Sequence, residues 1–90
     1  MKTQNVIVQC EYGLHLRVAS KVVAIAKQSG ASVHILCEGC PKADACSIIQ
    51  LLMLGASEGT PLKIEVESSE ENEQTVLQAL TAVFEEGGGI

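Results

Sequence analysis

Apolar residues along this chain recur with two different periods in turn, and this alternation constrains the fold more than any other feature. Residues 32–37 and 62–67 are apolar at alternate positions, which predicts two half-buried strands. Residues 16–28 are apolar every three to four positions, which predicts a helix that ends at Ser29-Gly30. A chain of 90 residues builds one small hydrophobic core, so strands and helices must share it. The pattern predicts a single α+β domain over residues 1–90.

The remaining elements are expected from shorter segments. We expect a first strand from Thr3 to Gln9, a loop from Cys10 to Leu14, and a short, irregular return strand around Pro41. A short helix from Ile48 to about Leu54 and a last helix after Ser68-Ser69 complete the order β-α-β-β-α-β-α. The expected fold is an open-faced α+β sandwich, in which three helices cover one face of an antiparallel four-stranded sheet.

The three predicted helices differ in how their apolar residues are distributed. The first has a core stripe at Ala19, Val22, Val23 and Ala26, with Leu16 and Val18 outside it. The last has one apolar face, formed by Val76, Leu77, Leu80, Val83 and Phe84. The short middle helix is apolar nearly all round, and a single core cannot bury every one of its side chains. We therefore expect part of the middle helix to be exposed and to contact a partner.

Composition and charge exclude several classes of function. The formal net charge is −5 with only six Lys and Arg, which argues against nucleic acid or an anionic membrane as a main partner. The segment Met1–Asn5 lacks the apolar run of a signal peptide, and no stretch is long enough to span a bilayer. We expect a cytoplasmic protein, and nothing in the sequence calls for more than a monomer.

Four cysteines allow more than one interpretation. Cys37 and Cys40 have C-x-x-C spacing across a predicted hairpin turn, and Cys10 stands apart from the others. The favoured interpretation is reduced thiols that pack as small hydrophobic groups and have no chemical role. A zinc site would need a further ligand from Cys46, Asp44 or His34, and regulatory oxidation is the third alternative. We predict no metal and no cofactor.

A histidine and an arginine stand where the first helix is predicted to begin. Gly13 turns the chain, His15 falls at the start of the helix, and Arg17 lies in its first turn. The unpaired N–H groups and partial positive charge of a helix start attract anions. Arg17 adds a planar, permanently charged donor suited to phosphate. This arrangement predicts a phosphate carrier, with a ring nitrogen of His15 as the phosphoryl acceptor.

Two segments resemble those of a known family. Gly13-Leu14-His15-Leu16-Arg17-Val18-Ala19 is similar to Gly-Leu-His-Ala-Arg-Pro-Ala of HPr, the histidine-containing phosphocarrier of the bacterial sugar phosphotransferase system. Ser47-Ile48-Ile49-Gln50-Leu51-Leu52 resembles that family's Lys-Ser-Ile-Met segment and its continuation. The resemblance covers the whole chain, and the two motifs stand at nearly the family spacing. It departs at Leu16 and Val18, which replace the family alanine and proline.

The resemblance implies a carrier protein rather than an enzyme. His15 would accept a phosphoryl group on Nδ1 from enzyme I, which phosphoenolpyruvate phosphorylates, and pass it to enzyme II A domains for sugar uptake. Arg17 would assist the transfer. Ser47 matches a serine that a dedicated serine kinase and phosphorylase modify in some bacteria, where a transcription regulator is a further partner. Contacts with enzyme I and enzyme II would involve Leu16, Arg17, Ser20, Ile48, Ile49 and Leu52.

Three alternatives stay open from the sequence. An HPr-like carrier can also serve a nitrogen-related regulatory phosphotransfer chain, and the motif around His15 does not separate the two pathways. A small ferredoxin-like ligand-binding domain has the order βαββαβ, but it leaves the last helix and the His15–Arg17 pair unexplained. A cysteine-based metal or redox module would use Cys37, Cys40 and Cys46.

Overall fold

The computed structural model describes residues 1–10 and 13–85, so Tyr12 and the glycine-rich tail at 87–90 lie outside the described residues. The chain forms the predicted order of strands and helices. The bounds are β1 Lys2–Ile7, α1 Leu16–Ser29, β2 Ser32–Cys37, β3 Ala43–Asp44, α2 Ile48–Met53, β4 Pro61–Glu67 and α3 Glu70–Glu85.

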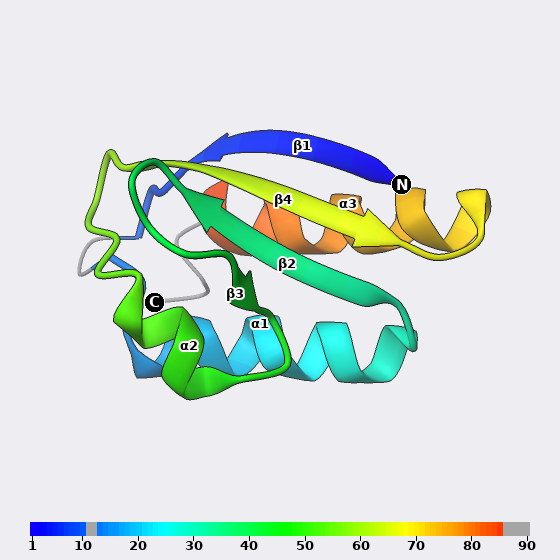
Figure 1. Ribbon diagram of the computed structural model, residues 1–90, viewed down its shortest axis with the longest axis horizontal. Helices are drawn as coiled ribbons and strands as arrows, with labels where there is room; N and C mark the ends of the chain where they lie inside the picture. The colour runs from blue at the N-terminus through cyan, green and yellow to red at the C-terminus, as the bar shows by residue number, and fades with distance from the viewer. Residues whose placement is uncertain (11–12, 86–90) are drawn as a thin grey trace.

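The four strands form one antiparallel sheet in the order β1-β4-β2-β3. β4, the last strand in the sequence, lies between β1 and β2 and pairs with both along its length. Figure 1 shows the helices on one side of this sheet, with the other side open. The predicted α+β open-faced sandwich with three helices on one face is therefore confirmed.

Burial follows the alternation seen in the sequence. The alternate apolar residues of β2 and β4 point to the helices, and Val33, Ile35, Ile64 and Val66 are at most 1% exposed. Among the described residues, the core is aliphatic apart from Cys10 and Phe84, and Phe84 at the end of α3 is fully buried. Leu80 lies one turn before Phe84 and is equally buried, so α3 joins the sheet through its apolar face.

Val18 corrects one expectation about α1. It was expected outside the core stripe, yet it is fully buried together with Ala19 and Val22. Val18 stands four positions before Val22 and therefore shares its face of the helix. The apolar face of α1 is thus wider than predicted, and Leu16 alone of the pair is exposed.

β1 ends earlier than expected. β1 ends at Ile7 instead of Gln9, because its partner β4 begins at Pro61, directly opposite Ile7. Beyond that point the chain bonds elsewhere: Val8 N–H donates to Thr60 O at 3.0 Å and Gln9 N–H to Phe84 O at 3.0 Å. The return strand is short, as expected, and consists of Ala43–Asp44 at the edge of the sheet, just after Pro41.

Candidate functional site

The loop before α1 is held directly against the backbone that follows α2. Gly13 N–H donates to Cys10 O at 2.9 Å, and Leu14 N–H donates to Ala56 O at 2.9 Å. Gly13 has a φ of 71°, and a Cβ there would lie 2.5 Å from Ala56 O and 2.8 Å from the Cα of Ser57. Only glycine fits this approach without a shift, so Gly13 places the following histidine relative to residues 56–57.

His15 is the N-cap of α1. Its backbone is extended, with φ −98° and ψ 179°, and its carbonyl accepts the first helical hydrogen bond from Ala19 N–H at 2.9 Å. Its ring Nδ1 accepts a hydrogen bond from Arg17 N–H at 3.3 Å. A nitrogen that accepts is the one without a proton, so the lone pair of Nδ1 points at the first turn of the helix. That lone pair is the nucleophile that phosphoryl transfer to a histidine requires.

Arg17 supplies two different groups to this site. Its backbone N–H already contacts the imidazole, while its side chain is exposed and makes no ion pair with another described residue. The first turn of α1 contains no acidic residue. The positive end of the helix and the guanidinium therefore act together on any anion that reaches Nδ1.

An exposed apolar patch lies beside the start of α1. α2 packs against α1, and Figure 1 shows α2 alongside the first turns of that helix. The exposed fractions are 61% for Leu16, 72% for Ile49 and 38% for Leu52. Met53 is 78% exposed, and the sequence prediction of binding residues omitted it although it belongs to the same apolar run. We call these four residues the apolar patch.

Two other residues named from the sequence occupy different environments. Ile48 is partly buried and packs against the core, so it supports the apolar patch instead of forming its surface. Ser20 is exposed on α1, three positions after Arg17 and on the same side of the helix.

Ser47 is the N-cap of α2, and its hydroxyl oxygen accepts a hydrogen bond from Gln50 N–H at 3.2 Å. The side chain of Gln50 in turn accepts from Asp44 N–H at 2.8 Å. Ser47 therefore has a structural role at the junction of β3 and α2, where it caps the helix.

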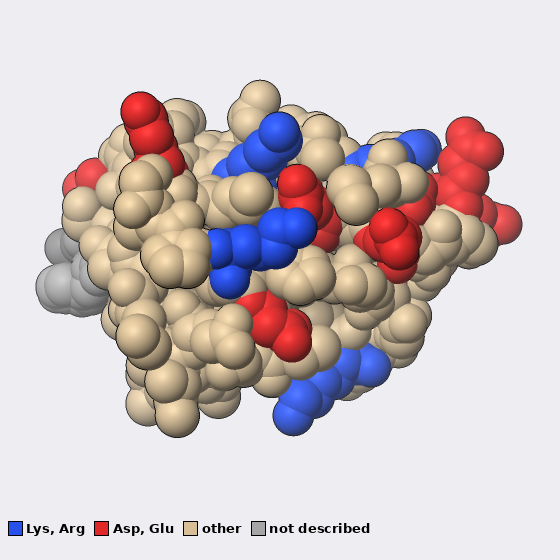
Figure 2. Space-filling model, in the orientation of Figure 1, with Lys and Arg blue, Asp and Glu red and all other residues tan. Residues whose placement is uncertain are grey.

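α2 itself carries no charged side chain. Figure 2 shows Lys, Arg, Asp and Glu interspersed over the open side of the sheet, whereas the surface over α2 in this view is free of them. The sequence of α2, Ile-Ile-Gln-Leu-Leu-Met, contains no charged residue. An uncharged surface beside a cationic helix start suits a partner that presents an apolar face around a phosphoryl group.

The cysteines do not join the histidine. Cys10 is buried under α3, with its Sγ 3.9 Å from Phe84 O, and burial raises the pKa of its thiol. Among residues 1–10 and 13–85, no three His, Cys, Asp or Glu side chains converge to hold a metal ion. Within the same residues, every helix is too short or too polar to cross a membrane.

The sequence is similar to one protein family and to characterised phosphocarrier proteins. The sequence model of the family described as "PTS HPr component phosphorylation site" matches residues 2–86. The chain is 31% identical to the phosphocarrier protein HPr of Xylella fastidiosa, over 94% of this chain and 92% of that protein. It is 33% identical to the phosphocarrier protein NPr of Escherichia coli, over 93% and 91%.

A solved structure agrees over the whole chain. The crystal structure of HPr-C-His from Thermoanaerobacter tengcongensis superimposes with a TM-score of 0.89, at 27% identity. The match covers 100% of this chain and 98% of that one.

Proposed function

The chain belongs to the HPr family of phosphocarrier proteins, and we propose that atom Nδ1 of His15 accepts and donates the phosphoryl group. The observation that carries this assignment is the hydrogen bond of 3.3 Å from Arg17 N–H to Nδ1, which orients the lone pair of that nitrogen. The donor is phosphorylated enzyme I, which takes its phosphoryl group from phosphoenolpyruvate. The acceptors are enzyme II A domains that serve sugar uptake in the cytoplasm.

The transfer needs no proton at the attacking nitrogen. The lone pair of Nδ1 forms the new bond to phosphorus, while the bond from phosphorus to the donor breaks and its electron pair stays with the donor. Arg17 N–H, which contacts Nδ1 at 3.3 Å before transfer, then turns to a phosphoryl oxygen. The guanidinium of Arg17 balances charge on the other oxygens, so the site stabilises the group mainly by position and charge.

The apolar patch is the proposed docking surface for both enzyme I and the enzyme II A domains. The patch lies beside the start of α1. A partner that covers the patch therefore brings its own reactive group to His15 and excludes water from the site. Arg17 and Ser20 form the polar edge of the same surface. We expect Val18 to leave transfer intact, because its side chain lies wholly in the core.

Phosphorylation with phosphoenolpyruvate and enzyme I tests the assignment. We expect the intact mass to rise by one acid-labile phosphoryl group. The variant His15→Ala should accept none, whereas His34→Ala, which removes the chain's other histidine from β2, should accept it at the rate of the parent protein. Acceptance by His15→Ala would overturn the proposal.

A second candidate pathway has its own support. The chain is 33% identical to the Escherichia coli protein NPr and 31% identical to the HPr relative, so a nitrogen-related regulatory chain fits the same site. Rates of phosphorylation by enzyme I of the sugar type and of the nitrogen type separate the two. A rate at least tenfold higher with one of them assigns the pathway.

We also propose that Ser47 is a regulatory phosphorylation site for a serine kinase and phosphorylase. The hydroxyl caps α2 directly beside Ile48 and the apolar patch, so a phosphate there adds negative charge next to the docking surface. Ser47→Asp should slow phosphorylation by enzyme I, and Ser47→Thr should not. Equal rates for all three proteins would refute this role, and with it a transcription regulator that reads the modified form.

A further inference from the structure

The C-x-x-C segment lies in a tight turn that brings its two cysteines together. Cys40 N–H donates to Cys37 O at 3.1 Å, which closes a β-turn over Glu38 and Gly39. Gly39 has a φ of 78°, which is the value that the third residue of a type II turn requires. The first and fourth Cα atoms of a β-turn lie within ~7 Å of each other. A disulfide spans about 4.4–6.8 Å between Cα atoms, a range that overlaps the separation allowed by such a turn.

The two thiols have complementary environments. Cys37 is the last residue of β2 and packs partly against the core, opposite Leu62 of β4. Cys40 is exposed, so a reagent in solution reaches it first. Burial raises the pKa of the Cys37 thiol, and the hydrogen bond and charge of the Cys40 thiol and the charge of Glu38 raise it further.

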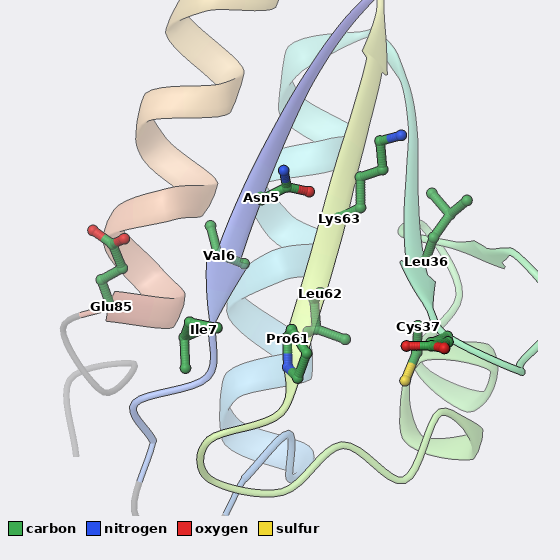
Figure 3. Close-up of a pocket in the computed structure, with 10 residues that line it drawn as sticks. Asn5, Val6, Ile7, Leu36, Cys37, Pro61, Leu62, Lys63 and Glu85 are labelled. Carbon is green, nitrogen blue, oxygen red and sulfur yellow. The ribbon is translucent and has the colours of Figure 1, made fainter.

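Each thiol also borders a different hollow. Figure 3 shows Cys37 near the end of β2, across from Leu62 and Pro61, at the rim of a hollow that also involves β1. Cys40 lines a second hollow together with Gln50, Met53 and Leu54 of the α2 region. Met53 belongs to the apolar patch, and Gln50 ties α2 to β3 through Asp44 N–H. A change in the position of Cys40 therefore alters the surroundings of Met53 and Leu54 at the C-terminal end of α2.

We infer that Cys37 and Cys40 form a reversible dithiol–disulfide pair, oxidised by small disulfides such as glutathione disulfide, whose state alters the hollow beside α2. The thiolate of Cys40 attacks one sulfur of the small disulfide, forms a mixed disulfide and releases one thiolate. The thiolate of Cys37 then attacks Sγ of Cys40 and releases the second. Two protein thiols are oxidised, one small disulfide is reduced to two thiols, and two electrons pass between them.

Oxidation by glutathione disulfide, followed by thiol counting in denaturant and intact mass, tests the pair. The parent protein should fall from four thiols to two, lose two hydrogens in mass and regain both thiols with a dithiol reductant. Cys37→Ser should instead retain a glutathionyl group on Cys40, because the second thiol that displaces it is gone. Cys46→Ser, the matched control, should still form the disulfide.

Two outcomes would overturn the inference. One is a parent protein that keeps a glutathionyl group as persistently as Cys37→Ser does. The other is a disulfide that joins Cys40 to Cys46. The link to α2 has its own readout, the backbone amide resonances of Gln50, Met53 and Leu54, which should shift on oxidation while those of the distant Gln28 and Ser29 stay in place. A disulfide that leaves these three resonances unmoved would refute the link. None of these measurements depends on phosphoryl transfer, so their failure is separate from failure of the proposed function.

Discussion

Replacing Gly13 by alanine tests how the loop before α1 is held. An alanine at a φ of 71° adopts the left-handed region, which costs about 1–2 kcal/mol for a residue with a side chain. The added Cβ also meets Ala56 O at 2.5 Å and the Cα of Ser57 at 2.8 Å, about 1 Å inside the usual ~3.5–4.0 Å contact. Overpacking of this kind costs about 1–3 kcal/mol. The expected loss of stability is therefore about 2–5 kcal/mol for Gly13→Ala.

Gly30→Ala is the matched control. Gly30 has nearly the same φ, 69°, but a Cβ there has nothing within 4 Å. It should cost only the backbone term of about 1–2 kcal/mol. Urea unfolding of both variants gives the difference, which we expect to be about 1–3 kcal/mol. Equal stabilities would show that the loop does not rest on residues 56–57, and the account of how His15 is positioned would be wrong.

Three further changes have defined outcomes. Ser47→Ala removes the cap of α2 and should lower the free energy of unfolding by about 0.5–2 kcal/mol in urea. Ile49→Glu should raise the Kd for enzyme I about thirtyfold, corresponding to ~2 kcal/mol, with Ile7→Glu on β1 unchanged as control; equal effects would remove α2 from the interface. Glu73 accepts from Ser68 N–H at 2.9 Å and lies 3.2 Å from the Met1 ammonium, and these contacts hold its pKa below the ordinary 4.5. Because the pKa is lower in the folded protein, the unfolded chain binds more protons as pH falls through 4.5. The stability that the ionised Glu73 contributes is therefore present above that pH and is lost as pH falls below it. Glu73→Gln should flatten the profile of stability against pH in this range.

The fold could be predicted from the sequence because the residues that are buried are those that the periodic pattern of apolar residues indicates. The alternation in β2 and β4 set which side chains face the helices, and Gly30 ended α1 where the pattern stopped. Boundaries were harder, because they depend on partners remote in sequence. β1 ends at Ile7 only because β4 begins at Pro61, and no local pattern at Ile7 records this.

The sequence located the start of α1 but did not predict the geometry there. Local motifs placed His15 at a helix start, yet the hydrogen bond from Arg17 N–H to its Nδ1 depends on the extended backbone of His15. The short helix was correctly expected to leave apolar residues exposed. Which of them are exposed depends on the angle at which α2 packs on α1, and this buries part of Ile48 while leaving Met53 uncovered.

Nuclear magnetic resonance of the phosphorylated protein, labelled with nitrogen-15 in histidine, tests the central claim most directly. The account predicts that the phosphoryl group is bonded to Nδ1 of His15. It also predicts a large shift of the amide proton resonance of Arg17, because its hydrogen bond passes from Nδ1 to a phosphoryl oxygen. A phosphoryl group on Nε2, or on His34, would contradict the claim that the start of α1 orients the acceptor nitrogen.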